Sequence, residues 1–111
     1  MIECRVHPRI PVELPIFFST AGNGDVREGT TFDISGGGCA IASTAAVNPG
    51  TGIKLLIQTD DLGAPITVHF AKIRWAHYGE FGVEFLNLTE MDRSRLARLL
   101  HIAAPPPARQ H

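Results

Sequence analysis

Two short stretches in the first third of the chain combine residue types that could bind a ligand. The first contains Arg5 and Arg9. A guanidinium is always charged, presents planar forked donors to phosphate and can stack on an aromatic base. The second is Asp33-Ile34-Ser35-Gly36-Gly37-Gly38, which combines a carboxylate, a hydroxyl and bare backbone amides. Because side chains alternate along an extended segment, we expect Asp33 and Ser35 on the same side. We interpret the second stretch as the centre of a binding site.

The glycine triplet in that stretch, Gly36, Gly37 and Gly38, costs conformational entropy on folding. A chain keeps such a run where the backbone needs a positive φ or where another group must approach closely. A purely structural explanation is also open, because Asp, Ser and Gly favour turns between strands for local reasons. A solvated polar leader would likewise account for the two arginines. Neither stretch identifies a function by itself.

The same residues give no indication of catalysis or of a metal site. Ser35 lacks a G-x-S-x-G elbow, and neither cysteine stands in a nucleophile signature. The glycine run lacks the lysine of a phosphate loop and precedes a strand instead of a helix. A structural zinc site needs a full set of ligands at tight spacing. Its ligands would have to be Cys4, His7 and Cys39, with a fourth from His69, His77 or His101. We therefore expect no enzyme, no metal and no cofactor.

The composition is typical of a small soluble domain. Of the 111 residues, 44% are hydrophobic and 19% are charged, which suits a single core. Ten Lys and Arg against eleven Asp and Glu give a net charge of -1, so no overall basic field favours nucleic acid or an anionic membrane. No signal peptide is recognisable, and no apolar run approaches the roughly 20 residues of a membrane span. We expect a cytoplasmic protein without membrane insertion.

Alternating apolar and polar residues predict six short strands. They are expected at residues 11–18, 27–34, 39–42, 53–58, 66–75 and 81–85. Pro15, within the first of them, indicates an edge or a bulge. In the fifth, apolar residues occupy even positions up to Phe70 and odd positions at Ile73 and Trp75. This switch predicts a β-bulge near Ala71-Lys72.

A helix is expected after the last strand. Thr89 can cap its N-terminus, with Asp92 as the partner in a partial capping box. The apolar positions follow helical spacing and comprise Leu96, Leu99, Leu100 and Ala103. Prolines 105–107 end the helix, so residues 104–111 are expected to form a disordered tail. Short strands at this spacing, followed by one helix, indicate an antiparallel barrel or sandwich.

The order and separation of the two polar stretches resemble the PilZ domain family. Arg5-x-x-x-Arg9 and Asp33-x-Ser35-x-x-Gly38 match the two signature motifs of that family, R-x-x-x-R and (D/N)-x-S-x-x-G. A predicted β-hairpin lies between them. The surroundings that also agree are Pro8 to Val12, Trp75 in a late strand, Gly82 to Phe85 in the last strand, and the terminal helix. The resemblance covers nearly the whole chain.

This resemblance implies a receptor for the bacterial second messenger cyclic di-GMP. It implies that Arg5 and Arg9 clamp the phosphates and stack on the guanine bases. Asp33 and Ser35 would hydrogen-bond a guanine, and Gly38 would keep the floor of the pocket open. Possible supporting positions are Gly36, Gly37 and Trp75.

The fold that the resemblance implies is a six-stranded antiparallel β-barrel with a C-terminal α-helix, in a single domain over residues 3–102. Its expected parts are a flexible arm at 1–10, the barrel at 11–88, the helix at 89–103 and the tail at 104–111. Cys4 stands where many family members have an arginine. That difference favours a single bound ligand over a stacked pair.

On this hypothesis, the ligand orders the N-terminal arm over the barrel, and an unidentified downstream protein recognises the change. The oligomeric state is left open. One alternative is an adaptor that binds a partner protein independently of the nucleotide. A second is a single-stranded nucleic-acid binder, which would need a basic groove with stacked aromatic residues. The near-neutral charge argues against that second alternative.

Overall fold

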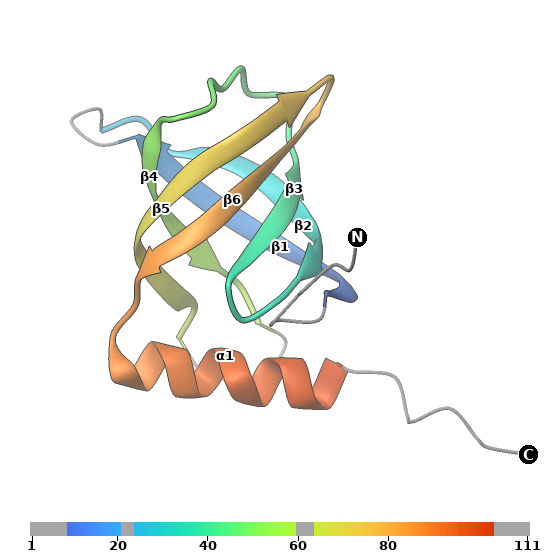
Figure 1. The fold of residues 1–111 in the computed structure, drawn as a ribbon, viewed down its shortest axis with the longest axis vertical. Coiled ribbons are helices and arrows are strands. Elements are labelled where there is room, and N and C mark those ends of the chain that lie inside the picture. The colour runs from blue at the N-terminus through green and yellow to red at the C-terminus, as the bar shows by residue number, and fades with distance from the viewer. Residues whose placement is uncertain (1–8, 21–23, 60–63, 104–111) are drawn as a thin grey trace, which may run out of the picture.

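The structure, a computed structural model, describes residues 9–20, 24–59 and 64–103. Its elements are β1 (Ile10–Thr20), β2 (Arg27–Ile34), β3 (Gly38–Ala42), β4 (Gly52–Ile57), β5 (Ile66–His77), β6 (Glu80–Asn87) and α1 (Glu90–Ala103). The strands form a closed barrel in the order β1-β2-β3-β6-β5-β4, and every neighbouring pair is antiparallel. Figure 1 shows the strands wrapping around one core. The predicted barrel and terminal helix are confirmed, and the sandwich alternative is wrong.

The barrel interior is filled by the apolar residues whose alternation predicted the strands. The largest fully buried side chains in it include Ile16, Ile34, Ile41, Ile53, Leu55, Ile57, Ile66, Ile73 and Phe81. The rings of Phe18 and Phe81 meet edge to face, with their centroids 5.2 Å apart. These two residues lie on β1 and β6, which are not neighbours, so the contact crosses the barrel. Burying such a side chain stabilises the fold by about 1.5–3 kcal/mol.

Helix α1 lies across one end of the barrel (Figure 1). The predicted cap is confirmed, because the Asp92 amide donates to Thr89 Oγ1 over 3.1 Å and the Thr89 hydroxyl donates to Asp92 Oδ2 over 2.9 Å. Asp92 Oδ1 also accepts a bond from the Thr67 amide of β5. Leu96, from the predicted apolar stripe, is 1% exposed in the core. Among the described residues, no helix is long and apolar enough to cross a membrane.

The side-chain directions on β5 differ from the prediction. Val68 and Ala71 both point inward, whereas Phe70 is 39% exposed. The predicted bulge near Ala71 is confirmed, because the register with β6 shifts between Phe70 and Ala71 and the pairing with β4 is irregular at the same place. It begins before Ala71, so Phe70 does not point inward as predicted. A further irregularity in the pairing with β6 lies between Ile73 and Trp75, and Trp75 is 37% exposed. Each bulge adds a residue that re-aims the side chains beyond it.

The position of Pro15 agrees with its prediction. The register of β1 with β2 shifts between Pro11 and Leu14, and the pairing of β1 with β4 begins at Ile16. Pro15 thus lies next to a bulge and at the end of the β1–β4 ladder. Its carbonyl still accepts a bond from the Gln58 amide over 2.9 Å.

Candidate ligand-binding site

An ion pair joins the two polar stretches singled out in the sequence. Arg9 lies directly before β1, and Asp33 lies on β2 opposite Pro11. Arg9 Nη2 is 2.7 Å from Asp33 Oδ1, and Arg9 Nε donates to the same oxygen over 2.9 Å. The two side chains are 36% and 27% exposed, so solvent reaches both. The structure therefore brings Arg9 and Asp33 together, while Arg5 falls outside the described residues.

Thr31 supports this pair from inside the barrel. Its hydroxyl lies 2.8 Å from the Ala40 carbonyl oxygen and 3.1 Å from that of Asp33, and its side chain is fully buried. The β2–β3 register shifts between Thr31 and Asp33, so the hydroxyl bonds backbone groups where the ladder is irregular. Sequence reasoning missed this role. The available signal was a polar Thr at a core position of a predicted strand.

The segment after Asp33 is a tight turn that Ser35 holds together. The Ser35 amide donates to the Gly38 carbonyl over 2.8 Å, and its hydroxyl lies 3.3 Å from the same oxygen. The Gly37 amide donates to Ser35 Oγ over 3.2 Å. Ser35 is only 5% exposed. Because β2 ends at Ile34, strand alternation does not extend to Ser35, and its hydroxyl bonds within the turn.

Of the glycine triplet, Gly38 is the residue at which the structure shows a close approach of another strand. Among the described residues, the glycines with positive φ are Gly50 and Gly79, so the positive-φ explanation of the triplet is wrong. At Gly38, a Cβ would overlap the carbonyl oxygen of Val83 on β6. The carbonyl of Gly37 accepts a bond from the Phe85 amide over 2.8 Å. The triplet therefore lets the turn and the start of β3 lie directly against β6.

Cys39 lies behind the turn and is chemically protected. It is 1% exposed, and burial raises the pKa of its thiol from 9.0 to about 12. Its hydrogen bond with Thr31 and the positive charge of Arg9 act in the opposite direction. A buried, protonated thiol is neither a nucleophile nor a metal ligand. The described residues contain no group of three or more potential metal ligands, and Cys4 and His7 lie outside them.

A row of paired residues connects Asp33 with Trp75 across the outside of the barrel. Asp33 pairs with Ala40, Ala40 pairs with Gly82, and Gly82 pairs with Trp75. The indole packs over Gly82, where a Cβ would overlap its ring. Three strand spacings of about 4.8 Å separate Trp75 from Asp33 by roughly 14 Å along the curved surface, half of the way around the closed barrel. Only small residues lie between them.

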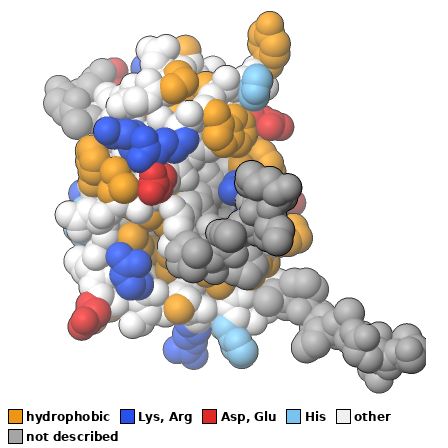
Figure 2. All heavy atoms as spheres, viewed as in Figure 1, with side chains coloured by type: hydrophobic (Ala, Val, Ile, Leu, Met, Phe, Trp, Pro, Cys, Tyr) orange, Lys and Arg blue, Asp and Glu red, His pale blue; other side chains and the backbone are white. Residues whose placement is uncertain are grey.

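The charges on the outside of the barrel are mixed. In the view of Figure 2, Lys and Arg side chains stand among Asp and Glu side chains and do not form a continuous basic stripe. The protein as a whole carries a net charge of -1. A nucleic-acid backbone therefore finds no basic groove on this face.

The family model described as "PilZ domain" matches residues 3–101. No curated protein shows significant sequence similarity to the chain. Among solved structures, the PilZ domain of CeSA from a cellulose-synthesizing bacterium is similar over 85% of this chain and 95% of its own, with a TM-score of 0.67 and 23% identity.

Two longer proteins also share the fold. The inhibitor of motility MotI/DgrA from Bacillus subtilis matches 88% of this chain with a TM-score of 0.75 and 17% identity. YcgR from Escherichia coli, solved in complex with c-di-GMP, matches 91% of this chain with a TM-score of 0.72 and 18% identity. The similar region covers 49% of MotI/DgrA and 46% of YcgR, so this chain corresponds to about half of each.

Proposed function

Because the chain belongs to the PilZ domain family, we propose that it binds cyclic di-GMP through Arg5, Arg9, Asp33, Ser35 and Gly38. Binding would be relayed to a downstream protein by ordering of the N-terminal arm. The structure of YcgR with c-di-GMP supports the choice of ligand, since that protein shares the fold. The protein acts as a receptor on this proposal and catalyses no reaction.

The observation that carries the proposal is the Arg9–Asp33 ion pair. It places one residue of each motif in contact although 24 positions separate them in sequence. Both Arg9 contacts converge on Asp33 Oδ1. Among the described residues, no donor is bound to Oδ2, and the side chain is partly exposed. Within the described part of the chain, Oδ2 is therefore open to a ligand donor, and Oδ1 becomes open when Arg9 moves away.

This geometry suits a guanine base with a phosphate nearby. A carboxylate accepts hydrogen bonds from adjacent N–H groups, and the Watson–Crick edge of guanine presents such donors. A guanidinium presents a similar pair of parallel N–H groups. Arg9 directs its two donors to Oδ1 alone, whereas a guanine edge would bond both carboxylate oxygens and take the place of Arg9. When the base binds Asp33, Arg9 can turn its donors to a phosphate, so that both charges remain compensated.

The remaining motif residues have structural duties as well. Ser35 would bind guanine by rotating its hydroxyl away from the Gly38 carbonyl. That carbonyl would still accept the bond from the Ser35 amide. Gly38 would contribute by keeping side-chain atoms away from the turn. Trp75, at the far end of the row that begins at Asp33, would give a supporting contact. Gly36 and Gly37 would shape the turn.

The relay would start at the first residues of β1. Arg9 is directly followed by Ile10, the first residue of β1, so a change at Arg9 acts on the chain entering the barrel. Ordering residues of the arm costs conformational entropy, which the phosphate and stacking contacts must offset. The arm would then present a surface that exists only with the ligand bound. This surface is what the downstream protein would recognise.

Isothermal titration calorimetry with cyclic di-GMP tests the proposal. The wild-type protein should bind saturably, and Arg9→Ala and Asp33→Ala should each abolish the signal. Circular dichroism of both variants should match the wild type, because both residues are partly exposed. The absence of heat at tens of micromolar ligand would reject the messenger. A partner that binds equally well without the nucleotide and to Arg5→Ala would instead support the adaptor alternative.

A further inference from the structure

A second cavity lies away from the proposed nucleotide site, between β1 and α1. Its volume is about 390 Å³. It is lined by Pro11, Val12, Glu13, Leu14, Thr59, Ile66, Arg95, Arg98, Leu99, Ile102 and Ala103. Pockets that bind small molecules usually measure about 300–1,000 Å³ and have mostly apolar walls. The cavity therefore has the size and the character of a ligand site.

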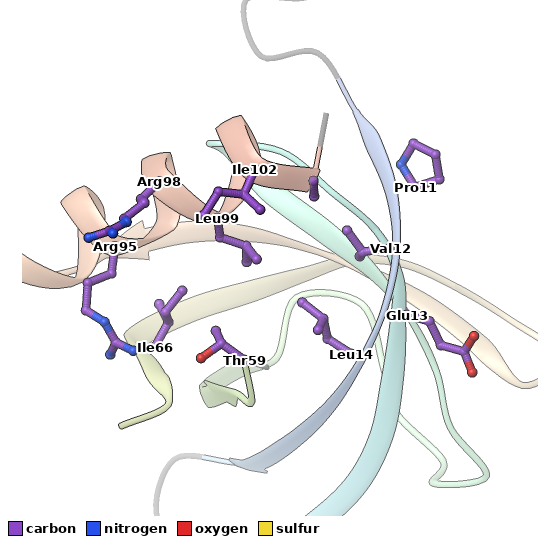
Figure 3. Close-up of a pocket in the computed structure, with 11 residues that line it drawn as sticks. Pro11, Val12, Glu13, Leu14, Thr59, Ile66, Arg95, Arg98, Leu99 and Ile102 are labelled. Carbon is purple, nitrogen blue, oxygen red and sulfur yellow. The ribbon is translucent and has the colours of Figure 1, made fainter. Parts of the chain in front are cut away.

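The walls of this cavity come from two elements that face each other. Figure 3 shows Leu99 and Ile102 pointing from α1 toward the space beside β1, with Val12 and Leu14 directed into it from the strand. Ile102 is 70% exposed, which is unusual for a large aliphatic side chain beside other apolar groups. Covering it would remove apolar surface from water.

The charge at the edge of the cavity is positive. Arg95 and Arg98 line it, and the Arg95 guanidinium is held in place by a 3.2 Å bond from Nη1 to the Pro65 carbonyl. No described residue forms a hydrogen bond or ion pair with Arg98. Glu13 also lines the cavity, but in Figure 3 its carboxylate points away on the other side of β1. In Figure 3 the Arg98 side chain extends away from β1 toward Arg95, so the two arginines mark the end of the cavity where an anion would bind.

We propose that this cavity binds an aliphatic carboxylate, that is, a free fatty acid of medium chain length. The carboxylate would lie against Arg98, within the positive field of Arg95. The chain would run between Leu99 and Ile102 on the helix and the apolar residues of β1. From Arg95 to Ile102 the helix rises about 10 Å, at 1.5 Å per residue, which is close to the length of an extended medium-length chain.

The proposal is independent of cyclic di-GMP. None of the motif residues Arg9, Asp33, Ser35 and Gly38 lines the cavity. The two sites are nevertheless connected through Pro11, which lines the cavity and pairs with Asp33 across β1 and β2. A ligand in the cavity would therefore act on the same strand start as the nucleotide.

Titration of the full chain with sodium decanoate, followed by backbone amide NMR without nucleotide, tests the proposal. The decanoate concentration is kept below that at which micelles form. We expect saturable shifts at Val12, Leu14, Leu99 and Ile102. Decanol, which has the same chain without the charge, should bind several-fold more weakly. Equal binding of the two, or shifts centred elsewhere, would overturn the proposal.

Matched variants distinguish binding of the carboxylate from binding of the aliphatic part of the ligand. Arg98→Gln should weaken decanoate binding about fivefold, the effect of losing an exposed ion pair, and should leave decanol binding unchanged. Arg93→Gln, on the same helix but outside the cavity lining, should bind as the wild type does. Ile102→Ala should weaken both ligands without affecting folding, because Ile102 is mostly exposed. Equal effects of Arg98→Gln and Arg93→Gln would contradict a specific site.

Three further outcomes would show a different occupant and reject the proposal. Binding to phosphatidylglycerol vesicles without binding of free decanoate would indicate a membrane surface. Decanoate binding that appears only after removal of residues 104–111 would indicate that the chain fills its own cavity. Loss of binding in Asp60→Asn/Asp61→Asn would mean that these acidic residues, which follow Thr59 in sequence, help to form the site. Our proposal predicts equal or tighter binding in this variant, because the substitutions remove two negative charges from the chain.

Discussion

Two arginine–carboxylate ion pairs on the outside of the barrel have nearly the same geometry and very different settings. Arg9 contacts Asp33 Oδ1 through both Nε and Nη2. Arg74 contacts Glu84 Oε1 through the same two nitrogens, with Nε at 2.7 Å. The exposures are 36% and 27% in the first pair and 52% and 47% in the second. Ion-pair geometry alone therefore does not identify a ligand site.

The surroundings of the two pairs differ. Arg74 and Glu84 lie on β5 and β6, consecutive strands that pair with each other. Arg9 and Asp33 connect the entry of β1 to β2, next to the glycine-rich turn and above the buried hydroxyl of Thr31. The Arg9–Asp33 pair thus lies where the chain enters the barrel, the place at which the proposed ligand would act on its path. The Arg74–Glu84 pair bridges two strands joined by a short turn, at the β5–β6 irregularity between Ile73 and Trp75.

The largest expected contrast between the pairs is in ligand affinity. Asp33→Ala should weaken cyclic di-GMP binding at least about a hundredfold, because the ligand loses the acceptor for its base and Arg9 loses its partner. Glu84→Ala, the matched control, should change the affinity by less than about twofold. The two variants should lose similar, small amounts of stability, up to about 1 kcal/mol each. Fluorescence anisotropy with a labelled nucleotide measures the affinities, and equal losses would remove the distinction between the pairs.

Gly38, which pairs with Glu84 across β3 and β6, lies between the two regions. Gly38→Ala should destabilise the protein by about 1–3 kcal/mol, because the new Cβ overlaps the Val83 carbonyl and the strands must separate. Gly24→Ala is the matched control, since a Cβ there meets nothing within 4 Å. Urea denaturation gives both values. An unchanged free energy of unfolding for Gly38→Ala would contradict a requirement for glycine at the β3–β6 contact.

A smaller effect is expected from Cys39, which is buried behind the Arg9–Asp33 pair and should make the stability of the protein depend on pH. The pKa of Cys39 rises from 9.0 in the unfolded chain to about 12 in the folded protein, mainly through burial. Its contribution to stability is therefore complete below pH 9 and is lost as the pH rises toward 12. The loss approaches about 1.4 kcal/mol per pH unit within that window. The free energy of unfolding, measured by urea denaturation from pH 8 to pH 11, should decrease more steeply with pH for Cys4→Ser than for Cys4→Ser/Cys39→Ala. Parallel pH dependences of the two variants would contradict the raised pKa of Cys39.

Much of the fold was predictable because local patterns and tertiary packing agree. Inward residues such as Ile53, Leu55 and Ile57 alternate in sequence and are buried in the structure. Thr89 and Asp92 form the predicted cap. The prediction was wrong where register, not alternation, sets the direction of a side chain. The parity switch in the sequence predicted a bulge near Ala71, but not that it begins before Ala71, and for this reason the outward direction of Phe70 was missed.

The site was predictable only in part, for a related reason. The two motifs identify Arg9 and Asp33 from residue types and spacing, but their contact depends on how β1 pairs with β2. The turn geometry that engages the Ser35 hydroxyl appears only where β2 ends. The cavity beside α1 could not be predicted, since its walls come from segments far apart in sequence.

The most direct test of the central claim is the NMR signal of the arginine Nε–H groups during titration with cyclic di-GMP. Arg9 and Arg74 each donate through Nε to a carboxylate, so one spectrum reports on both ion pairs. We predict that the Arg9 signal shifts and saturates with the ligand while the Arg74 signal stays in place. Saturable nucleotide binding that leaves the Arg9 signal unchanged would contradict the account.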